Sequence, residues 1–149
     1  MHETRSAKGG DSLADILKTD VPFTRKDWDL LPEDFRVELI DGQLLKMPSP
    51  TVGHQQSIGR MMMLLIEPLG FDRVLIGPVD FAIDDHNVLV PDLVVFREGE
   101  LPGPNARDIT TALVVIEVLL PSTAARDRKI KRAKYLAAGA GEVWLIDGG

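Results

Sequence analysis

The chain has 149 residues, of which 44% are hydrophobic and 27% charged, and its formal net charge is −6 at pH 7. This length suits one domain, and the acidic balance argues against a general nucleic-acid coat while leaving room for a local basic patch. The absence of cysteine excludes disulfides and thiolate metal sites, so a metal would need oxygen ligands or one of the three histidines. The longest apolar runs are too short and too charged for a bilayer, and the N-terminus lacks a secretory signal, so we expect a cytoplasmic protein with no membrane contact.

The first part of the chain predicts an arm, a short helix and a hairpin. Residues 1–20 are polar and contain glycine, which favours a flexible N-terminal arm ahead of a single domain over residues 21–149. Thr24 can cap a short helix. Two apolar segments flank Asp41-Gly42, a dipeptide typical of the tight turn in a β-hairpin.

The middle of the chain predicts a second helix followed by strands. Ser49 or Thr51 can cap this helix, whose apolar residues recur at helical spacing. Residues 97–111 are rich in glycine and proline and are expected to form a loop. The segments before and after this loop are typical of strands: "RVLIG", "VDFAI", "NVLVPDLVVF" and "ALVVIEVLL".

The C-terminal part predicts a helix and a last strand. Ser122 or Thr123 can cap "AARDRKIKRAKYLAAG", which ends at Gly139. The segment "EVWLID" then forms the last strand, and we expect that edge strands beyond it are missing. The order of elements predicts an α/β domain with a mixed sheet.

Three strand-like segments each carry one acid among apolar neighbours: Glu38 in "FRVELIDG", Asp92 in "VLVPDLVVF" and Glu117 in "VVIEVLLPST". An ionised carboxylate in such a strand costs several kcal/mol unless it is paired, hydrogen-bonded or bound to a metal. One interpretation is that the acids converge on a divalent cation such as Mg²⁺, which activates water and polarises a phosphodiester. The alternative is that each acid lies at a strand end, faces water or caps a turn.

The predicted C-terminal helix supplies positive charge close to Glu117. Six basic residues crowd into positions 126–134, and most of them are expected to form a solvated face. Lys131 is the exception, because helical spacing places it on one face with Asp127 and Tyr135. Since the helix begins just after the strand that carries Glu117, Lys131 can reach toward the carboxylates and stabilise charge on a phosphorane oxygen.

His54 lies near the start of the second predicted helix. It can contact phosphate, shuttle a proton or cap the turn before the helix, and the sequence leaves these alternatives open. We interpret His54, Arg128 and Tyr135 as candidate substrate-binding residues.

The sequence blocks that carry these residues resemble the Uma-two family. The blocks are Glu38 with "LIDGQLLKMPSPTVGH", then "VPDLVVF", "LVVIEVLLPST", Asp127 with Lys131 and Tyr135, and "GEVWLID". Their order and spacing are specific, and the resemblance covers about residues 25 to 147. The family is grouped with the restriction-endonuclease-like PD-(D/E)xK fold.

This resemblance implies an α/β fold with a restriction-endonuclease-like αβββαβ core and a mixed central sheet flanked by helices. It implies that Asp92 and Glu117 bind a divalent metal and that Glu38 is the early glutamate of the family. The usual lysine two residues after the second acid is replaced by Leu119, which points to Lys131 from the following helix. Two further departures, Leu120 in place of serine and "GAGEVWLID" in place of "GVPEYWLVD", are not expected to abolish metal binding.

The first functional hypothesis is a DNA endonuclease that depends on Mg²⁺ or Mn²⁺. Its catalytic residues would be Glu38, Asp92, Glu117 and Lys131, with the three acids as metal ligands, and Glu38 would hold a second ion or orient the water. A homodimer would allow both strands of a duplex to be cut. The second hypothesis is a catalytically inactive nuclease-like module that serves binding or assembly.

Overall fold

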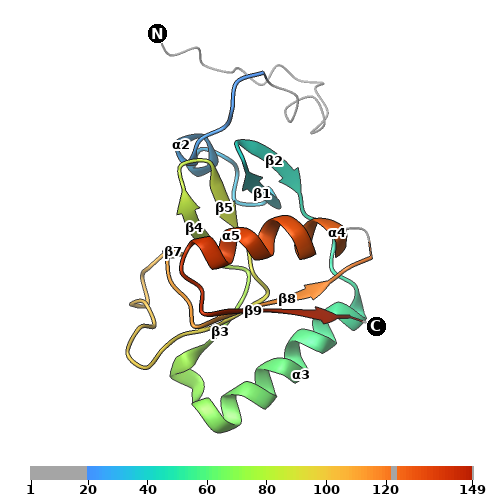
Figure 1. Cartoon of the computed structure of the whole chain (residues 1–149), viewed down its shortest axis with the longest axis vertical. Coiled ribbons are helices and arrows are strands. Elements are labelled where there is room, and N and C mark those ends of the chain that lie inside the picture. Colours follow the sequence, from blue (N-terminus) through green and yellow to red (C-terminus); the bar gives the residue numbers. More distant parts are fainter. Residues whose placement is uncertain (1–19, 122–123, 149) are drawn as a thin grey trace.

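The computed structural model of the chain describes residues 20–121 and 124–148 (Figure 1). The predicted arm lies outside these ranges apart from Asp20, and so do the predicted caps Ser122 and Thr123. Within the described ranges, no helix has both the length and the apolar character needed to cross a membrane.

The first of two mixed sheets lies in the upper part of Figure 1 and has five strands in the order β2-β1-β5-β4-β7. All neighbours in it are antiparallel except β4 and β7, which are parallel. The predicted hairpin is confirmed, since Asp41 and Gly42 both have positive φ, as a tight hairpin turn requires. The strands are β1 (Val37–Ile40), β2 (Gln43–Lys46), β4 (Asp80–Asp84), β5 (Asn87–Leu89) and β7 (Asp108–Ile109).

The second sheet has four strands in the order β3-β6-β8-β9. Strand β6 pairs antiparallel with β3 on one side and with β8 on the other, and β9 runs parallel to β8. Strand β8 is buried along its whole length, as its continuous apolar sequence predicts. The strands are β3 (Val74–Ile76), β6 (Leu93–Val95), β8 (Val114–Leu119) and β9 (Glu142–Asp147).

The chain passes from the first sheet to the second at residues 90–92. The sequence predicted one strand here, but β5 ends at Leu89 and β6 begins at Leu93. Pro91 has no N–H to give to a ladder, which explains the interruption. Gly77 supports the break, because its N–H donates to the carbonyl oxygen of Asp92 at 2.8 Å and a Cβ atom at position 77 would overlap the carbonyl oxygen of Pro91. The crossing therefore places Asp92 where the two sheets meet.

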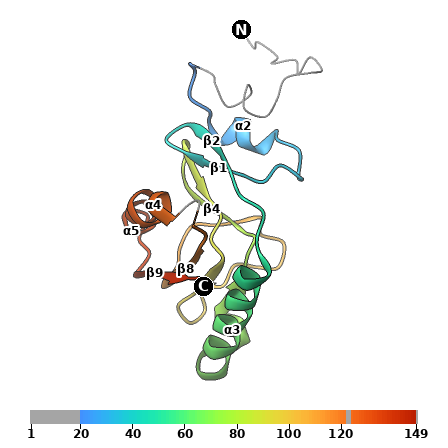
Figure 2. The ribbon, with the colours of Figure 1, turned by 90° about the vertical axis from the view of Figure 1, so that its right-hand side faces the viewer.

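Helices cover the two faces of the second sheet, as the side view in Figure 2 shows. Helix α3 (Val52–Leu69) packs Ile58 and Leu65 onto one face. The opposite face carries a helix made of α4 (Ala124–Arg126), a π-helical turn η2 (Asp127–Lys131) and α5 (Arg132–Ala137), and buries Tyr135 against it. Two short helices complete the fold: α2 (Arg25–Asp29) and the 3-10 helix η1 (Phe71–Arg73).

The predicted helix caps agree with the structure where it describes them. Thr24 forms a capping box with Asp27 at the start of α2. Of the two candidates for α3, Thr51 is the cap, and its hydroxyl accepts from the backbone N–H of His54 at 3.1 Å. Gly139 follows the end of α5 with a φ of 95°. The loop expected over residues 97–111 also contains the short strand β7.

We predict that Gly77→Ala lowers the free energy of unfolding by about 1–3 kcal/mol, because the added methyl group forces the backbone at Pro91 to move. Chemical unfolding measured by circular dichroism would test this. Gly59→Ala is the matched control: Gly59 lies inside α3 with open space at its Cβ position, so alanine should stabilise the protein by about 0.5–1 kcal/mol. Equal stability of Gly77→Ala and the natural chain would contradict the proposed close approach.

Candidate active site

Asp92 and Glu117 lie near each other where the two sheets meet. Asp92 immediately precedes β6, whose first residue Leu93 pairs with Ile116 of β8, so Asp92 lies beside the part of β8 that carries Glu117. Val115 faces the core that contains Tyr135, and alternation along β8 directs Glu117 to that side. The backbone N–H of Val118 donates to Oδ2 of Asp92 at 2.7 Å, which fixes the aspartate to the neighbouring strand.

The two acids line one small cavity of about 50 Å³. Three more of the predicted site residues, Glu38, His54 and Lys131, line the same cavity. They come from β1, the start of α3 and the π-helical turn, so the cavity lies where the two sheets and both long helices meet. The structure thus brings together five side chains that the sequence placed on separate elements.

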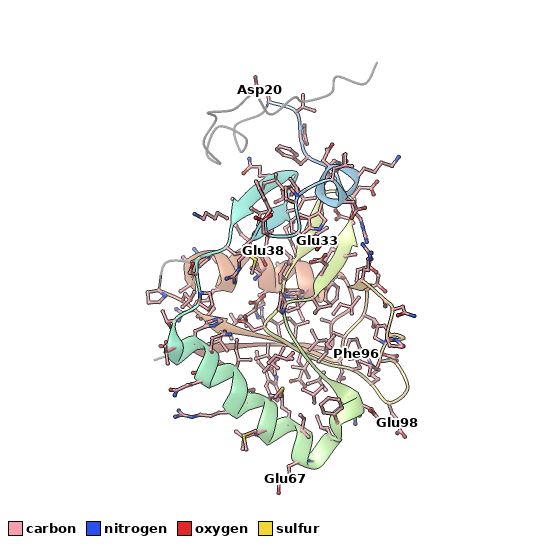
Figure 3. All side chains as sticks on the ribbon, turned by 180° about the vertical axis from the view of Figure 1, so that it is seen from behind. Asp20, Glu33, Glu38, Glu67, Phe96 and Glu98 are labelled. Carbon is pink, nitrogen blue, oxygen red and sulfur yellow. The ribbon has the colours of Figure 1, made fainter. Side chains whose placement is uncertain are left out.

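Lys131 connects two of the acids inside the protein. Its Nζ atom lies 2.5 Å from Oε1 of Glu117 and 2.8 Å from Oε1 of Glu38. Figure 3 shows Glu38 on β1 beside the helix that carries Lys131. The three residues are 3%, 1% and 4% exposed for Lys131, Glu38 and Glu117, so these contacts are made out of water. Two further hydrogen bonds hold the acids: Val90 N–H donates to Glu38 at 2.9 Å, and the Tyr135 hydroxyl donates to Glu117 at 2.7 Å.

The predicted helical face of Lys131 and Tyr135 is observed, since both residues contact Oε1 of Glu117. Lys131 is the last residue of the π-helical turn, a feature that often occurs at functional sites. The side chain of Asp127, the third residue of the predicted face, lies outside the described part of the structure.

Burial dominates the electrostatics of Glu117. It raises the pKa of the carboxyl group to about 8, with Lys131 lowering it and the negative charges of Glu38 and Asp92 raising it further. Burial and the nearby charge of Glu117 also raise the pKa of Tyr135 well above its usual value. Tyr135 is therefore a neutral hydrogen-bond donor at physiological pH, which suits it to orient Glu117.

The ring of His54 points to Asp92. Its Nε2 atom lies 3.4 Å from Oδ2 of Asp92, and Nδ1 lies 3.1 Å from Oε1 of Gln55. The backbone N–H of the same residue is held by the cap of α3. His54 thus takes part in the helix cap through its backbone, and its side chain is available to the cavity.

Two arginines differ in their position relative to the cavity. Arg128 is exposed and does not line the cavity, so its predicted contact with substrate stays a prediction. Arg36 does line the cavity with an exposed side chain, and sequence reasoning missed it. The signal was its position two residues before Glu38, because residues two apart on an extended segment share a face.

The carboxylate donors fit one hard divalent cation. Mg²⁺ in proteins is commonly held by one or two carboxylates together with water and substrate phosphate, and Asp92 and Glu117 supply two carboxylates at one cavity. Both contacts of Glu117 are made to Oε1, so Oε2 takes part in neither. Among the described residues, no group of three or more His, Asp and Glu side chains is arranged to hold a metal by itself. The donor set therefore suits an ion with few protein ligands.

The fold is that of a nuclease-like α/β domain, as comparison with known proteins shows. A crystal structure of "a putative nuclease belonging to DUF820" from Anabaena variabilis superposes with a TM-score of 0.72 at 23% sequence identity, covering 85% of this chain and 74% of that one. The family model Uma2, described as "Putative restriction endonuclease", matches residues 25–148, and the chain belongs to this family. No protein with curated annotation matches the sequence. The predicted family and the restriction-endonuclease-like fold are thus confirmed.

We predict that the stability of the natural chain relative to Glu117→Gln falls as pH rises from about 5 to 8 in metal-free buffer. Between the ordinary pKa of 4.5 and the folded value of about 8, the folded state keeps a proton on Glu117 that the unfolded state releases. Unfolding then releases protons, so rising pH favours it. Urea unfolding of both proteins at several pH values would measure the difference. Parallel curves across this range would contradict the raised pKa.

Proposed function

We propose that this protein is a divalent-metal-dependent phosphodiesterase that cleaves DNA internally, with Mg²⁺ or Mn²⁺ as its cofactor. Membership of a family whose description is "Putative restriction endonuclease" supports nuclease activity in general. The observation that carries the finer proposal is the position of Asp92 and Glu117, which line one cavity with Lys131 while the N–H next to Glu117 in the chain, that of Val118, holds Asp92.

In this proposal, Asp92 and Glu117 hold the ion. A bound divalent ion would polarise the phosphodiester and lower the pKa of the attacking water. Tyr135 and the N–H of Val118 keep the two carboxylates in place, because each donates a hydrogen bond to one of them. The hydrolysis is an in-line displacement at phosphorus.

The remaining residues of the cavity stabilise charge on the substrate and orient the side chains that bind the ion and the phosphate. Lys131 places a positive charge where the phosphoryl group gains negative charge in the transition state. Glu38 orients Lys131 through the contact at 2.8 Å and is itself fixed by Val90. His54 orients Asp92 from the start of α3, and Arg36 binds a substrate phosphate from the exposed side of the cavity. A homodimer would present two such sites to the two strands of a duplex.

A second candidate is a nuclease-like module that binds nucleic acid without cutting it. Two observations favour it: the cavity is small and partly lined by Leu120, and no three-ligand metal group is present among the described residues. The two functions differ in one measurable property, because only the first requires a divalent ion and the carboxylate of Asp92 to change the covalent state of DNA.

We predict that the natural chain nicks supercoiled plasmid in the presence of Mn²⁺ and that Asp92→Asn lowers the rate by about 100-fold or more, since it removes one ligand and its charge. Gel electrophoresis of the plasmid would follow the reaction. Asp72→Asn is the matched control: Asp72 is exposed on η1 and does not line the cavity, so its rate should equal that of the natural chain.

Equal nicking by the natural chain and Asp92→Asn would identify a contaminating nuclease and remove the proposed activity. Binding of DNA by both proteins without any Mn²⁺-dependent nicking would favour the second candidate.

A further inference from the structure

The buried position of Lys131 needs a physical account beyond its role in catalysis. Lysine is almost never fully buried unless it is paired, and here an ammonium group that is 3% exposed lies between two carboxylates. With only one of these acids ionised the cluster would be neutral, and with both it carries one negative charge. Lys131 is therefore a cation that pairs with both buried acids.

The two acids are anchored independently of Lys131. The backbone N–H of Val90 holds Glu38, and the hydroxyl of Tyr135 holds Glu117. Lys131 contacts the anchored oxygens from the end of a flexible four-carbon chain. The movable part of this cluster is thus the ammonium group rather than either carboxylate.

A divalent cation on Glu117 would lie close to the ammonium group that now contacts Oε1 of the same residue at 2.5 Å. Like charges at such short range repel strongly in a site removed from water. Each cation therefore weakens the binding of the other to Glu117, unless a further anion arrives.

We propose that Lys131 is an internal counterion that competes with the divalent cation for Glu117, so that cation and substrate phosphate bind cooperatively. This inference rests on the metal site of the proposed function. A phosphate group in the cavity gives Lys131 a second anionic partner while Glu38 keeps hold of it, and Glu117 becomes available to the cation. Because binding free energies are linked, the cation strengthens phosphate binding by the same factor. Without substrate the protein holds the metal weakly.

Mn²⁺ binding, measured by electron paramagnetic resonance of the free ion, tests this without any catalytic readout. The natural chain should bind Mn²⁺ at least about tenfold more tightly when thymidine monophosphate is present, since this nucleotide offers a phosphate but no internal bond to cleave. Lys131→Met should bind Mn²⁺ at least about tenfold more tightly than the natural chain without the nucleotide, and should gain little when it is added.

Lys134→Met is the matched control. It removes a lysine three residues further along the same helix, but Lys134 pairs with Asp41 outside the cavity at 2.6 Å. Its Mn²⁺ affinity should equal that of the natural chain. Weaker or unchanged Mn²⁺ binding in Lys131→Met would overturn the competition between lysine and metal.

Removal of Lys131 leaves two buried acids facing each other, which can prevent folding. If circular dichroism shows this, the double variant Lys131→Met with Glu38→Gln removes the charges of both members of the Lys131–Glu38 pair and carries the same prediction. Asp92→Asn distinguishes a failure of the proposed metal site from a failure of the competition between Lys131 and the metal. If Mn²⁺ binds Lys131→Met equally well with and without Asp92→Asn, the proposed metal site is wrong and the inference fails with it. If Asp92→Asn weakens Mn²⁺ binding but Lys131→Met does not strengthen it, the proposed metal site stands and the competition is overturned.

Discussion

The whole arrangement depends on one juxtaposition: Asp92, held by the N–H of Val118, and Glu117 on β8 line the same cavity. A shift of register by one residue in β8 would turn Glu117 toward α3, where its neighbours are the apolar side chains of the other core. The apolar residues that alternate with the acids therefore do more than fill the core. By fixing the register of β6 on β8, they fix the distance between two carboxylates.

Hydrogen bonds from surrounding residues offset the free-energy cost of burying these carboxyl groups. Isolated buried charges cost several kcal/mol each, whereas here every acid receives a hydrogen bond from a backbone N–H or from Tyr135. These contacts come from elements that are distant in the sequence. The site thus doubles as the junction of the two sheets, and its electrostatics and the stability of the fold are linked.

Much of this architecture could be predicted from the sequence because its causes are local. The Asp41-Gly42 turn, the caps Thr24 and Thr51, and the apolar alternation of β8 each depend on a few neighbouring residues. The convergence of the acids and Lys131 followed from the family resemblance and from strand and helix spacing. Other features depend on long-range contacts, which a local pattern does not contain. One of these is the parallel pairing of β7 with β4, which joins a two-residue strand inside the predicted loop to a strand that lies far from it in the sequence.

The most direct test of the central claim is to locate the metal. Crystals grown with Mn²⁺ and measured near the manganese absorption edge would show its position by anomalous scattering. We expect a manganese peak in the cavity within ligand distance of the carboxylates of Asp92 and Glu117. When a phosphate is bound, Lys131 should have moved away from Glu117. A peak that avoids both carboxylates, or an occupied cation site elsewhere with this cavity unchanged, would contradict it.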